Sequence, residues 1–378
     1  MHVETLLADL VAIPDLPGQS NAAMSAYVQH HLERAGAKVS VLRGPEGDRD
    51  NIFATLGPAD QSGYILSGHM DVVPVAGQDW TSDPFTLTTR DGRLYGRGTT
   101  DMKGFLASML ATAYVHGDTA LSHPLHFAFS YDEEIGCRGV GHMIERLPDL
   151  CAPPLGCIIG EPTNMAPALS HKGKHAATLR LTGASAHSST PSEGANAIYP
   201  IAELALFVRD LNAELATNGP FDPRFDPPHS TVVAGMIAGG TAVNIIPDAC
   251  GLWVECRAVP GQNPTDMIDR ITRFAQDQVD RGAALSLEVE TLGMYPALPP
   301  PSDDTLANML QQLTGRAAIP AVSYGTEAGL FNAAGFSAII CGPGSMTRAH
   351  KPDEYIEPAE LADCCEMLDK LVSTLVAG

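Results

Sequence analysis

The stretch LHFAFSYDEE, residues 125–134, decides the fold class of this 378-residue chain. It starts as a continuous apolar run and ends in acidic residues, which is typical of a buried strand that ends at the edge of a sheet. The segments YILSGHMD (residues 64–71) and LGCIIGEP (residues 155–162) have the same form. Between these three segments lie residues 102–117 and 138–147, whose patterns are helical. Strands that alternate with helices predict an α/β domain with a mostly parallel sheet and helices on both faces.

A different order of elements begins near residue 172. The predicted strands are residues 175–183, 231–240, 249–259 and 284–293, and the predicted amphipathic helices are residues 195–215 and 265–280. The resulting order, β-α-β-β-α-β, is typical of a ferredoxin-like α+β domain. We therefore expect a catalytic, metal-binding domain in two parts, residues 1–171 and 292–378. A smaller lid or dimerisation domain is expected to be inserted between them, over residues 172–291.

The charge of the chain limits its possible partners. It has 23 Lys and Arg against 44 Asp and Glu, a formal net charge of −21. Nucleic acids and anionic membranes both require cationic patches, so neither is an expected partner. No apolar run reaches the roughly 18 residues of a membrane helix, and the first residues lack the basic and apolar regions of a signal peptide. These features predict a cytoplasmic protein.

Common cofactor motifs do not explain the acidic residues. The sequence has no H-E-x-x-H motif, no Walker A motif and no EF-hand loop. The segment GRGTTD, residues 96–101, begins like a dinucleotide-binding motif but has Asp101 at the position of the third glycine. A carboxylate at that helix N-terminus would repel a pyrophosphate, which argues against a dinucleotide site.

Residues of the types that bind metals follow the predicted strands. His69 follows YILSG, Glu133 and Glu134 follow LHFAFSYD, Glu161 follows LGCIIG, and Asp101 opens the helix over 102–117. Ligands of open α/β sheets bind outside the carboxyl ends of the strands, so we expect these side chains to meet at one edge. Each residue alone would be interpreted as a solvated loop residue or a surface acid. Together, this many anions at one edge require a compensating cation.

The donor types indicate the kind of cation. Asp71 lies two residues after His69 on an extended segment, so it can hold the imidazole of His69. His350, in AHKPDE after another apolar run, is the candidate for a late ligand. Oxygen and nitrogen donors without thiolates suit zinc, cobalt or manganese. One histidine per ion with shared carboxylates indicates two metals, about 3.5–4 Å apart.

Eight motifs follow one another along nearly the whole chain: HMDVVP, GRGTTDMKG, DEEIGCRG, GEPTN, GASAHSSTPSEGANAI, NIIPD, YGTEAG and GPGSMTRAHKPDE. Together they resemble the dinuclear zinc amidohydrolases, a family that includes acetylornithine deacetylase, succinyl-diaminopimelate desuccinylase and carboxypeptidase G. The resemblance implies two divalent metal ions, zinc or cobalt. It also implies the roles of the candidate residues: Asp101 as the bridging ligand, His69 and Glu161 on one ion, Glu134 and His350 on the other, Glu133 as general base, and Asp71 as the partner of His69.

The resemblance extends to substrate contacts and to assembly. His187, in GASAHSST, would be an oxyanion donor, acting within the chain or across a dimer, and Asn244 and Arg257 would contact the substrate. Glu327, in YGTEAG, would meet the side-chain ammonium of the substrate. By residue type alone, His187 is equally compatible with a surface histidine and Glu327 with an acid at a helix N-terminus. We expect a homodimer formed through the inserted domain.

The expected function is the metal-dependent hydrolysis of an N-acyl amino acid. The segments around Glu327 and His350 are most similar to the acetylornithine deacetylase branch of the family. This similarity implies N2-acetyl-L-ornithine as the substrate and a step of arginine biosynthesis. Four alternatives remain open at this point: a broader N-acyl amino acid deacylase, a succinyl-diaminopimelate desuccinylase-like enzyme, an aminopeptidase, and a non-catalytic protein that binds small molecules with the same fold.

Overall fold

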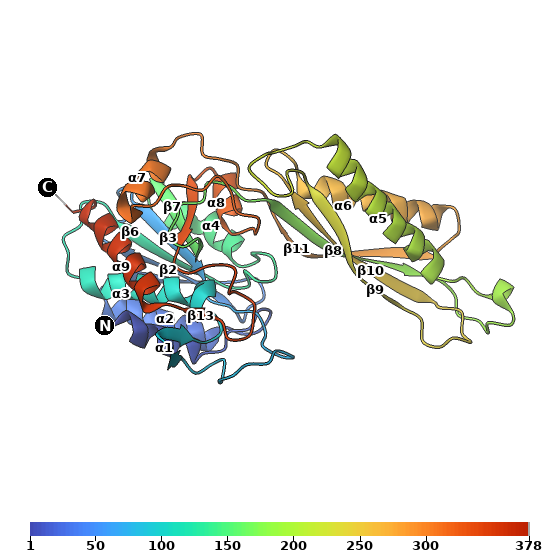
Figure 1. Cartoon of the computed structure of the whole chain (residues 1–378), viewed down its shortest axis with the longest axis horizontal. Helices are drawn as coiled ribbons and strands as arrows, with labels where there is room; N and C mark the ends of the chain where they lie inside the picture. Colours follow the sequence, from blue (N-terminus) through green and yellow to red (C-terminus); the bar gives the residue numbers. More distant parts are fainter. Residues whose placement is uncertain (377–378) are drawn as a thin grey trace. The chain divides into compact units, whose positions relative to one another are not determined.

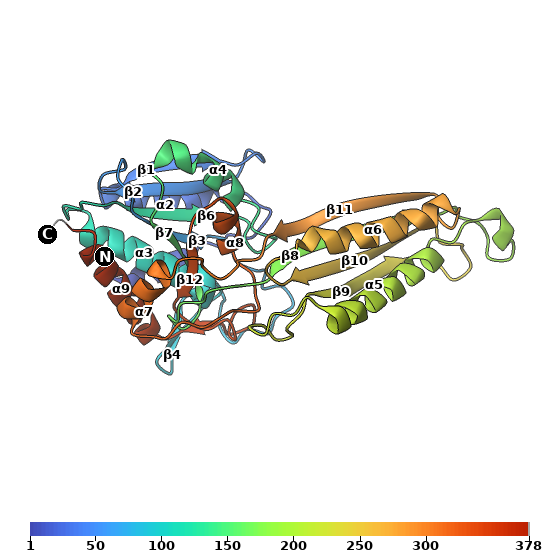
Figure 2. The same ribbon diagram turned by 90° about the horizontal axis from the view of Figure 1, so that it is seen from above.

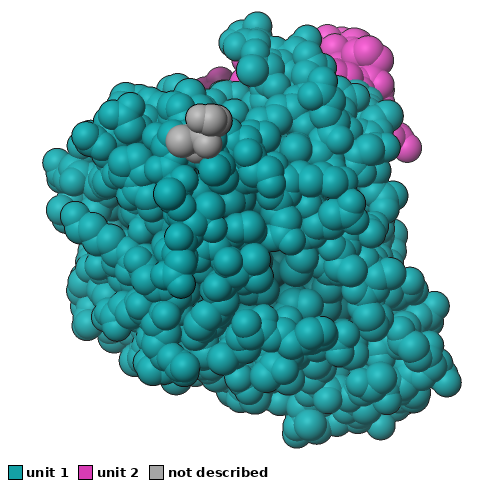
Figure 3. All heavy atoms as spheres, turned by 90° about the vertical axis from the view of Figure 1, so that its left-hand side faces the viewer, with its two compact units in different colours: residues 1–170, 300–321, 326–378 teal, residues 171–299, 322–325 magenta. Residues whose placement is uncertain are grey.

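The chain folds into two compact units in the computed structural model, which describes residues 1–376. The first unit contains residues 1–170, 300–321 and the segment from residue 326 onward. The second unit contains residues 171–299 and 322–325. Figure 3 colours the two units separately and shows one face of the first. Each unit has its own hydrophobic core.

The first unit is built on a six-stranded sheet in the order β1-β2-β6-β3-β7-β12. Strands β6, β3, β7 and β12 pair in parallel, whereas β1 and β2 add to them in antiparallel fashion. The mostly parallel sheet predicted from the apolar runs is therefore confirmed. The strands are β1 (Lys38–Arg43), β2 (Asp50–Leu56), β3 (Tyr64–His69), β6 (Leu125–Ser130), β7 (Gly156–Pro162) and β12 (Ala338–Gly342).

Helices cover both faces of this sheet (Figures 1 and 2). Helix α3 (Gly104–His116) is apolar nearly all round, because it lies between the sheet and a second layer formed by α1 and α9. Helices α4 and α8 contact each other and pack against β2 and β7. No helix within residues 1–376 combines the length and the apolarity needed to cross a membrane. The remaining helices of the unit are α1 (Val3–Val11), α2 (Ala22–Arg34), α4 (Val140–Leu150), α7 (Thr305–Thr314), α8 (Ala328–Ala333) and α9 (Pro358–Ser373).

A small three-stranded sheet lies beside the large one in the first unit. Its order is β13-β5-β4, with β4 at Thr88–Arg90, β5 at Arg93–Tyr95 and β13 at Tyr355–Ile356. Tyr355 pairs with Tyr95 and Ile356 with Leu94. This pairing brings the segment before α9 against the turn before α3, although about 260 residues of chain separate them.

The second unit has the predicted ferredoxin-like order. Its sheet runs β11-β8-β10-β9 with every pair antiparallel, and α5 and α6 pack together on one face of it (Figures 1 and 2). Apolar residues of the strands and helices form a separate core there. The elements are β8 (Gly173–Thr182), α5 (Ile198–Asn218), β9 (Thr231–Gly239), β10 (Ala249–Ala258), α6 (Pro264–Asp280) and β11 (Ser286–Tyr295).

The boundary of the second unit differs from the prediction. The predicted end at residue 291 falls inside β11, because this strand continues through a register shift between Thr291 and Gly293. Beyond the strand, Leu298 pairs with His171, so residues up to 299 belong to the second unit. The short segment 322–325 also belongs to it, since Val322 pairs with His171. The segment after β11 is rich in Pro, and nothing in its local pattern indicates these contacts.

Candidate metal centre and active site

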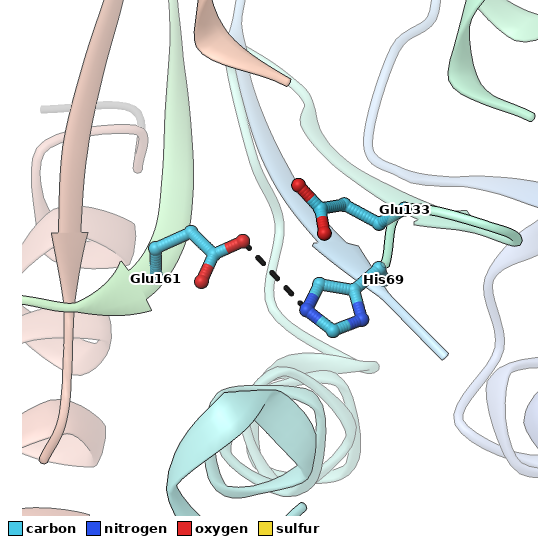
Figure 4. A group of neighbouring side chains, drawn as sticks. All are labelled: His69, Glu133 and Glu161. Atoms are coloured by element: carbon cyan, nitrogen blue, oxygen red, sulfur yellow. Dashed lines mark ion pairs between the residues drawn. The ribbon is translucent and has the colours of Figure 1, made fainter. Parts of the chain in front are cut away.

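Three neighbouring parallel strands bring an imidazole and three glutamates to one edge of the sheet. His69 ends β3, Glu161 lies near the end of β7, and Glu133 and Glu134 follow β6. Strands β6, β3 and β7 are adjacent, so residues at their carboxyl ends meet. The Nε2 atom of His69 is 3.7 Å from Oε1 of Glu161, and Figure 4 shows the Glu133 carboxylate on the same side of the imidazole.

Asp101 faces two histidines with its two carboxylate oxygens. Its Oδ1 is 3.1 Å from Nε2 of His69, and its Oδ2 is 3.1 Å from Nε2 of His350. The turn before α3 makes this possible, because Gly98 has a left-handed φ of 80° and Asp101 has extended rather than helical dihedrals. One carboxylate between two imidazoles is the arrangement expected of a ligand that bridges two cations.

His350 reaches the site from the loop after β12. Its Nε2 is 3.1 Å from Oε2 of Glu134, and its φ is 63°. The His350 side chain is 50% exposed, whereas those of Asp101 and Glu134 are 6% and 7% exposed. The site is therefore closed on the sheet side and accessible on the side of the His350 loop.

Asp71 faces the imidazole of His69 and also makes contacts that the sequence did not predict. The Nδ1 atom of His69 is 2.8 Å from the backbone oxygen of Asp71 and 3.6 Å from its Oδ1, so the carbonyl is the nearer partner. The Asp71 carboxylate instead accepts hydrogen bonds from the backbone N–H groups of Glu133, at 3.0 Å, and Glu134, at 3.2 Å. Asp71 thus fixes the backbone of both glutamates as well as facing the imidazole.

The donor set fits divalent metal ions. Within 4.8 Å, ligand atoms gather in two overlapping groups, His69 with Glu133 and Glu161, and His69 with Asp101 and Glu134. The groups contain nitrogen and oxygen donors and no thiolate, a composition that suits zinc, cobalt or manganese. Asp101 pairs closely with both His69 and His350, whereas the two donor groups share His69 and the first of them includes Glu133.

The electrostatics of the site show how strongly it favours positive charge. Burial raises the pKa of Glu133 to about 8 and raises the pKa values of Glu134 and Glu161. Burial also acts on Asp101, but hydrogen bonds from His350 and His69 outweigh it and lower the pKa of that carboxyl. The hydrogen bonds to Asp101 and Glu134 raise the pKa of His350 to about 10. Carboxylates retain protons here because too few cationic groups surround them, and bound cations would replace those protons.

The side chain of Glu327 is buried in the first unit and is not at its surface. It is 1% exposed and accepts hydrogen bonds from Ser130 and, at 3.2 Å, from Ser67. Burial raises the pKa of its carboxyl to about 7. The two serines were not among the predicted site residues, although each is a polar residue inside an apolar strand. Cys137 was missed as well, and its Sγ lies 3.2 Å from Oε1 of Glu133.

The second unit holds the other three predicted substrate contacts. His187 is exposed and its Nδ1 lies 2.7 Å from Oγ of Ser189. Asn244 is close in the fold, because its backbone oxygen accepts a hydrogen bond from Ser188 at 3.0 Å. Arg257 lies near the far end of β10, roughly 26 Å of extended strand from the end that follows Asn244. The unit therefore brings His187 and Asn244 together and holds Arg257 apart from them.

Arg257 is anchored within its own unit. Its Nε donates to Oε1 of Glu255 at 2.7 Å and its Nη1 to the hydroxyl of Tyr295 at 2.9 Å. Its side chain is 29% exposed. A guanidinium held by two partners is oriented, and it keeps further N–H groups for a planar anion.

The chain is similar to known proteins over almost its whole length. The model of peptidase family M20/M25/M40 matches residues 65–374. Acetylornithine deacetylase from Proteus mirabilis (strain HI4320) is 34% identical over 378 residues, covering 97% of this chain and 95% of the relative. The acetylornithine deacetylase from Pasteurella multocida (strain Pm70) is 33% identical over 366 residues, covering 95% and 93%.

Solved structures show the same fold at low sequence identity. An M20 family metallo-carboxypeptidase from Sulfolobus solfataricus superposes with a TM-score of 0.78 at 17% identity, covering 98% of both chains. A tripeptidase from Staphylococcus aureus superposes with a TM-score of 0.76 at 18% identity, covering 99% of this chain and 97% of the other. The chain thus belongs to the peptidase family M20/M25/M40 and is a hydrolase that acts on amide bonds.

Proposed function

We propose that this protein hydrolyses the amide bond of N2-acetyl-L-ornithine, giving L-ornithine and acetate, with two divalent metal ions held by Asp101, His69, Glu161, Glu134 and His350. The observation that carries the proposed chemistry is the position of Asp101, whose two oxygens face two different histidines at 3.1 Å each. The substrate is suggested by the relatives, because two acetylornithine deacetylases are similar to this chain over almost its full length.

Glu133 is the proposed general base. Divalent ions in this site would lower the pKa of water and polarise the amide carbonyl, and zinc and cobalt both suit the donors. Glu133 then accepts the proton of the attacking water and delivers it to the leaving amine. The geometry supports different roles for Glu133 and Glu134. Glu134 pairs with His350 at 3.1 Å, whereas the side chain of Glu133 has a hydrogen bond with Cys137.

The substrate carries opposite charges at its two ends, and we assign a group to each. Arg257 would pair with the α-carboxylate, and Asn244 and His187 would contact the substrate and the developing oxyanion. Glu327 would supply negative charge toward the distal ammonium. Burial raises the pKa of this carboxyl to about 7, so it carries its charge above that pH, and a charge in a low local dielectric acts strongly on a nearby ammonium. Among the described residues no Lys or Arg forms an ion pair with it.

A homodimer through the second unit is part of this proposal. Strand β9 is an edge strand, and its Val233, Met236 and Ile237 are 56%, 60% and 55% exposed. An apolar edge of this kind favours pairing with a second copy. His187 and Arg257 lie near opposite ends of their sheet, so two chains provide both groups to one small substrate more readily than one chain does.

Subunit complementation tests the dimer. Two variants, His187→Ala and Glu133→Gln, are each expected to be nearly inactive. If His187 acts across the interface, mixing the two and allowing subunit exchange restores part of the activity. Full wild-type activity in a protein that sedimentation shows to be a monomer at every concentration would contradict the dimer.

The function is tested by turnover of a substrate panel with zinc-loaded and cobalt-loaded protein. The panel contains N2-acetyl-L-ornithine, N-acetyl-L-methionine, a succinylated diamino acid and an aminoacyl amide. We expect N2-acetyl-L-ornithine to be preferred. Equal or better cleavage of N-acetyl-L-methionine would indicate a broader deacylase, and cleavage of only the succinylated compound a desuccinylase. Cleavage of only the aminoacyl amide would indicate an aminopeptidase, and binding without turnover a non-catalytic protein.

A further inference from the structure

Glu354 is a buried acid next to the proposed metal-binding residues. It is neither one of the proposed metal ligands nor the proposed general base. It is 1% exposed, and both of its carboxylate oxygens are occupied. Oε1 accepts the backbone N–H groups of Thr100, at 2.9 Å, and Asp101, at 3.0 Å. Oε2 accepts the backbone N–H of Gly98 at 3.1 Å and Nη1 of Arg97 at 2.7 Å. Four donors from one turn therefore converge on a single carboxylate.

The backbone around Glu354 is bonded to the same turn. The Glu354 carbonyl accepts a hydrogen bond from the N–H of Gly96 at 3.0 Å, and the Tyr355 carbonyl accepts one from Oγ1 of Thr100 at 2.6 Å. Strand β13, which begins at Tyr355, pairs with β5 directly before the turn. The segment that follows His350 is thus attached along its length to the segment that precedes Asp101.

Arg97 balances the charge of Glu354 and extends the contacts to His350. Arg97 is 1% exposed, and its guanidinium carbon lies 5.0 Å from the ring centre of Trp80. Its Nη2 donates to Oε1 of Gln78, whose Nε2 in turn donates to the His350 carbonyl at 3.0 Å. His350 has a left-handed φ of 63°, a conformation that requires support from its surroundings. Gln78 provides such support.

We propose that Glu354 is a positioning residue that sets the Asp101 carboxylate and the His350 imidazole at the separation required for metal binding. Asp101 and His350 come from segments about 250 residues apart, and their side chains face each other at 3.1 Å. Glu354 fixes the backbone N–H of Asp101 from a position four residues after His350. Without the carboxylate, the N–H groups of Gly98, Thr100 and Asp101 lose their acceptor, and the turn is free to rotate Asp101 away. This inference rests on the metal site of the proposed function.

The test compares metal binding by the full-length wild type and Glu354→Gln. An amide keeps the size of the side chain but offers one acceptor oxygen in place of two, and its NH2 group faces donors. We expect Glu354→Gln to bind zinc and cobalt 10- to 100-fold more weakly, measured by competition with a chromophoric chelator. The visible absorption spectrum of the cobalt-loaded variant is expected to differ from that of the wild type. Wild-type affinity together with an unchanged cobalt spectrum would overturn the proposal.

Two further variants separate positioning from folding. Asp353→Asn makes the same acid-to-amide change one residue away, where the side chain bonds to Thr81, so its metal affinity should equal that of the wild type. Glu354→Gln also leaves the buried charge of Arg97 unbalanced, and the double variant Arg97→Met/Glu354→Gln removes that imbalance. Metal affinity should stay low in the double variant even as thermal stability of the metal-free protein recovers. Recovery of both would overturn the proposal, and absence of metal binding by the wild type would overturn the proposed function instead.

Discussion

The Asp71 carboxylate accepts the backbone N–H of Glu133 at 3.0 Å, so the proposed general base is held by the loop that follows His69. The neighbouring N–H of Glu134 bonds to the other Asp71 oxygen at 3.2 Å. One side chain therefore sets the position of two consecutive glutamates, and their side chains diverge to different partners, Cys137 and His350. This arrangement allows two adjacent residues of the same type to have separate functions.

The first prediction concerns this contact. Asp71→Asn replaces one of the two acceptor oxygens by an NH2 group that faces a backbone N–H, so the loop of Glu133 should shift. We expect kcat to fall about 10- to 100-fold, as is usual when a residue that supports a metal site is changed. Steady-state kinetics with saturating zinc measures the effect. An unchanged kcat would mean that the Asp71 contact does not position the base.

Asp101 provides the second prediction. Asp101→Asn loses the negative charge that faces both histidines, so we expect both metal ions to be lost. Glu161→Gln is the matched comparison, because Glu161 pairs with His69, at 3.7 Å, and forms no ion pair with His350 in the described part of the chain, so this variant should weaken the binding of one ion. Metal analysis after equilibration with zinc should give about two ions for the wild type, one for Glu161→Gln and none for Asp101→Asn. Two ions in Asp101→Asn would exclude a bridging role.

The third prediction separates the two adjacent glutamates. Glu133→Gln removes the proton acceptor and leaves the ligands in place, so turnover should fall about 10²–10⁴-fold with both ions retained. Glu134→Gln should instead lower metal affinity, because Glu134 pairs with His350. Both measurements are made on the same preparations. Near-normal turnover by metal-loaded Glu133→Gln would assign the base elsewhere.

The sequence predicts the parts of this site that follow from strand ends. His69, Glu133 and Glu161 could be grouped because parallel strands present their carboxyl ends at one edge, and apolar runs reveal those strands. Glu354 could not be predicted in this way. Its four hydrogen bonds join segments about 255 residues apart, and nothing in the local pattern of either segment specifies such a pairing.

Long-range contacts also explain the other residues and the domain boundary that the sequence did not predict. Ser67 and Ser130 appear in the sequence only as small polar residues within buried strands, and their common partner Glu327 lies 260 residues after Ser67 and 197 residues after Ser130. The end of the second unit was placed too early because the pairing of Leu298 with His171 is also a long-range contact. Local periodicity predicts elements, whereas contacts of this kind depend on how the elements pack.

The fourth prediction concerns Asp15, a buried carboxyl whose Oδ2 has no hydrogen-bond partner among the described residues. Burial raises its pKa from 3.8 to about 7, so the folded state binds the proton more tightly than the unfolded state. The stability that this proton provides is present below about pH 4 and is lost as the pH rises through about 7. The free energy of unfolding of Asp15→Asn should therefore exceed that of the wild type by about 2–4 kcal/mol at pH 8 and equal it at pH 4.

Urea unfolding of metal-free protein at several pH values measures this effect. The exposed Asp60→Asn variant is the control, and it should follow the wild type throughout. Lys103 is also buried, and burial lowers its pKa to about 8, so its own contribution varies above pH 8 and lies outside the chosen window. A constant difference between Asp15→Asn and the wild type from pH 4 to pH 8 would contradict the assignment to Asp15.

The last prediction tests the proposed role of Glu327 in substrate choice. If its negative charge faces the ammonium of N2-acetyl-L-ornithine, a charge-assisted interaction of about 1.5–3 kcal/mol corresponds to roughly 10- to 150-fold in kcat/KM over N-acetyl-L-methionine. Glu327→Gln removes the charge and keeps one acceptor oxygen, so it retains the hydrogen bond from one of the two serines, which donate to different carboxylate oxygens, while the hydroxyl of the other serine can rotate to accept from the NH2 group. The preference should then fall toward equality through slower cleavage of the ornithine derivative, with kcat/KM for N-acetyl-L-methionine unchanged. Ser67→Ala is the matched control, because it removes one hydrogen bond and leaves the charge in place. An equal loss for both substrates in Glu327→Gln would show that the buried carboxylate supports the site and does not recognise the ammonium.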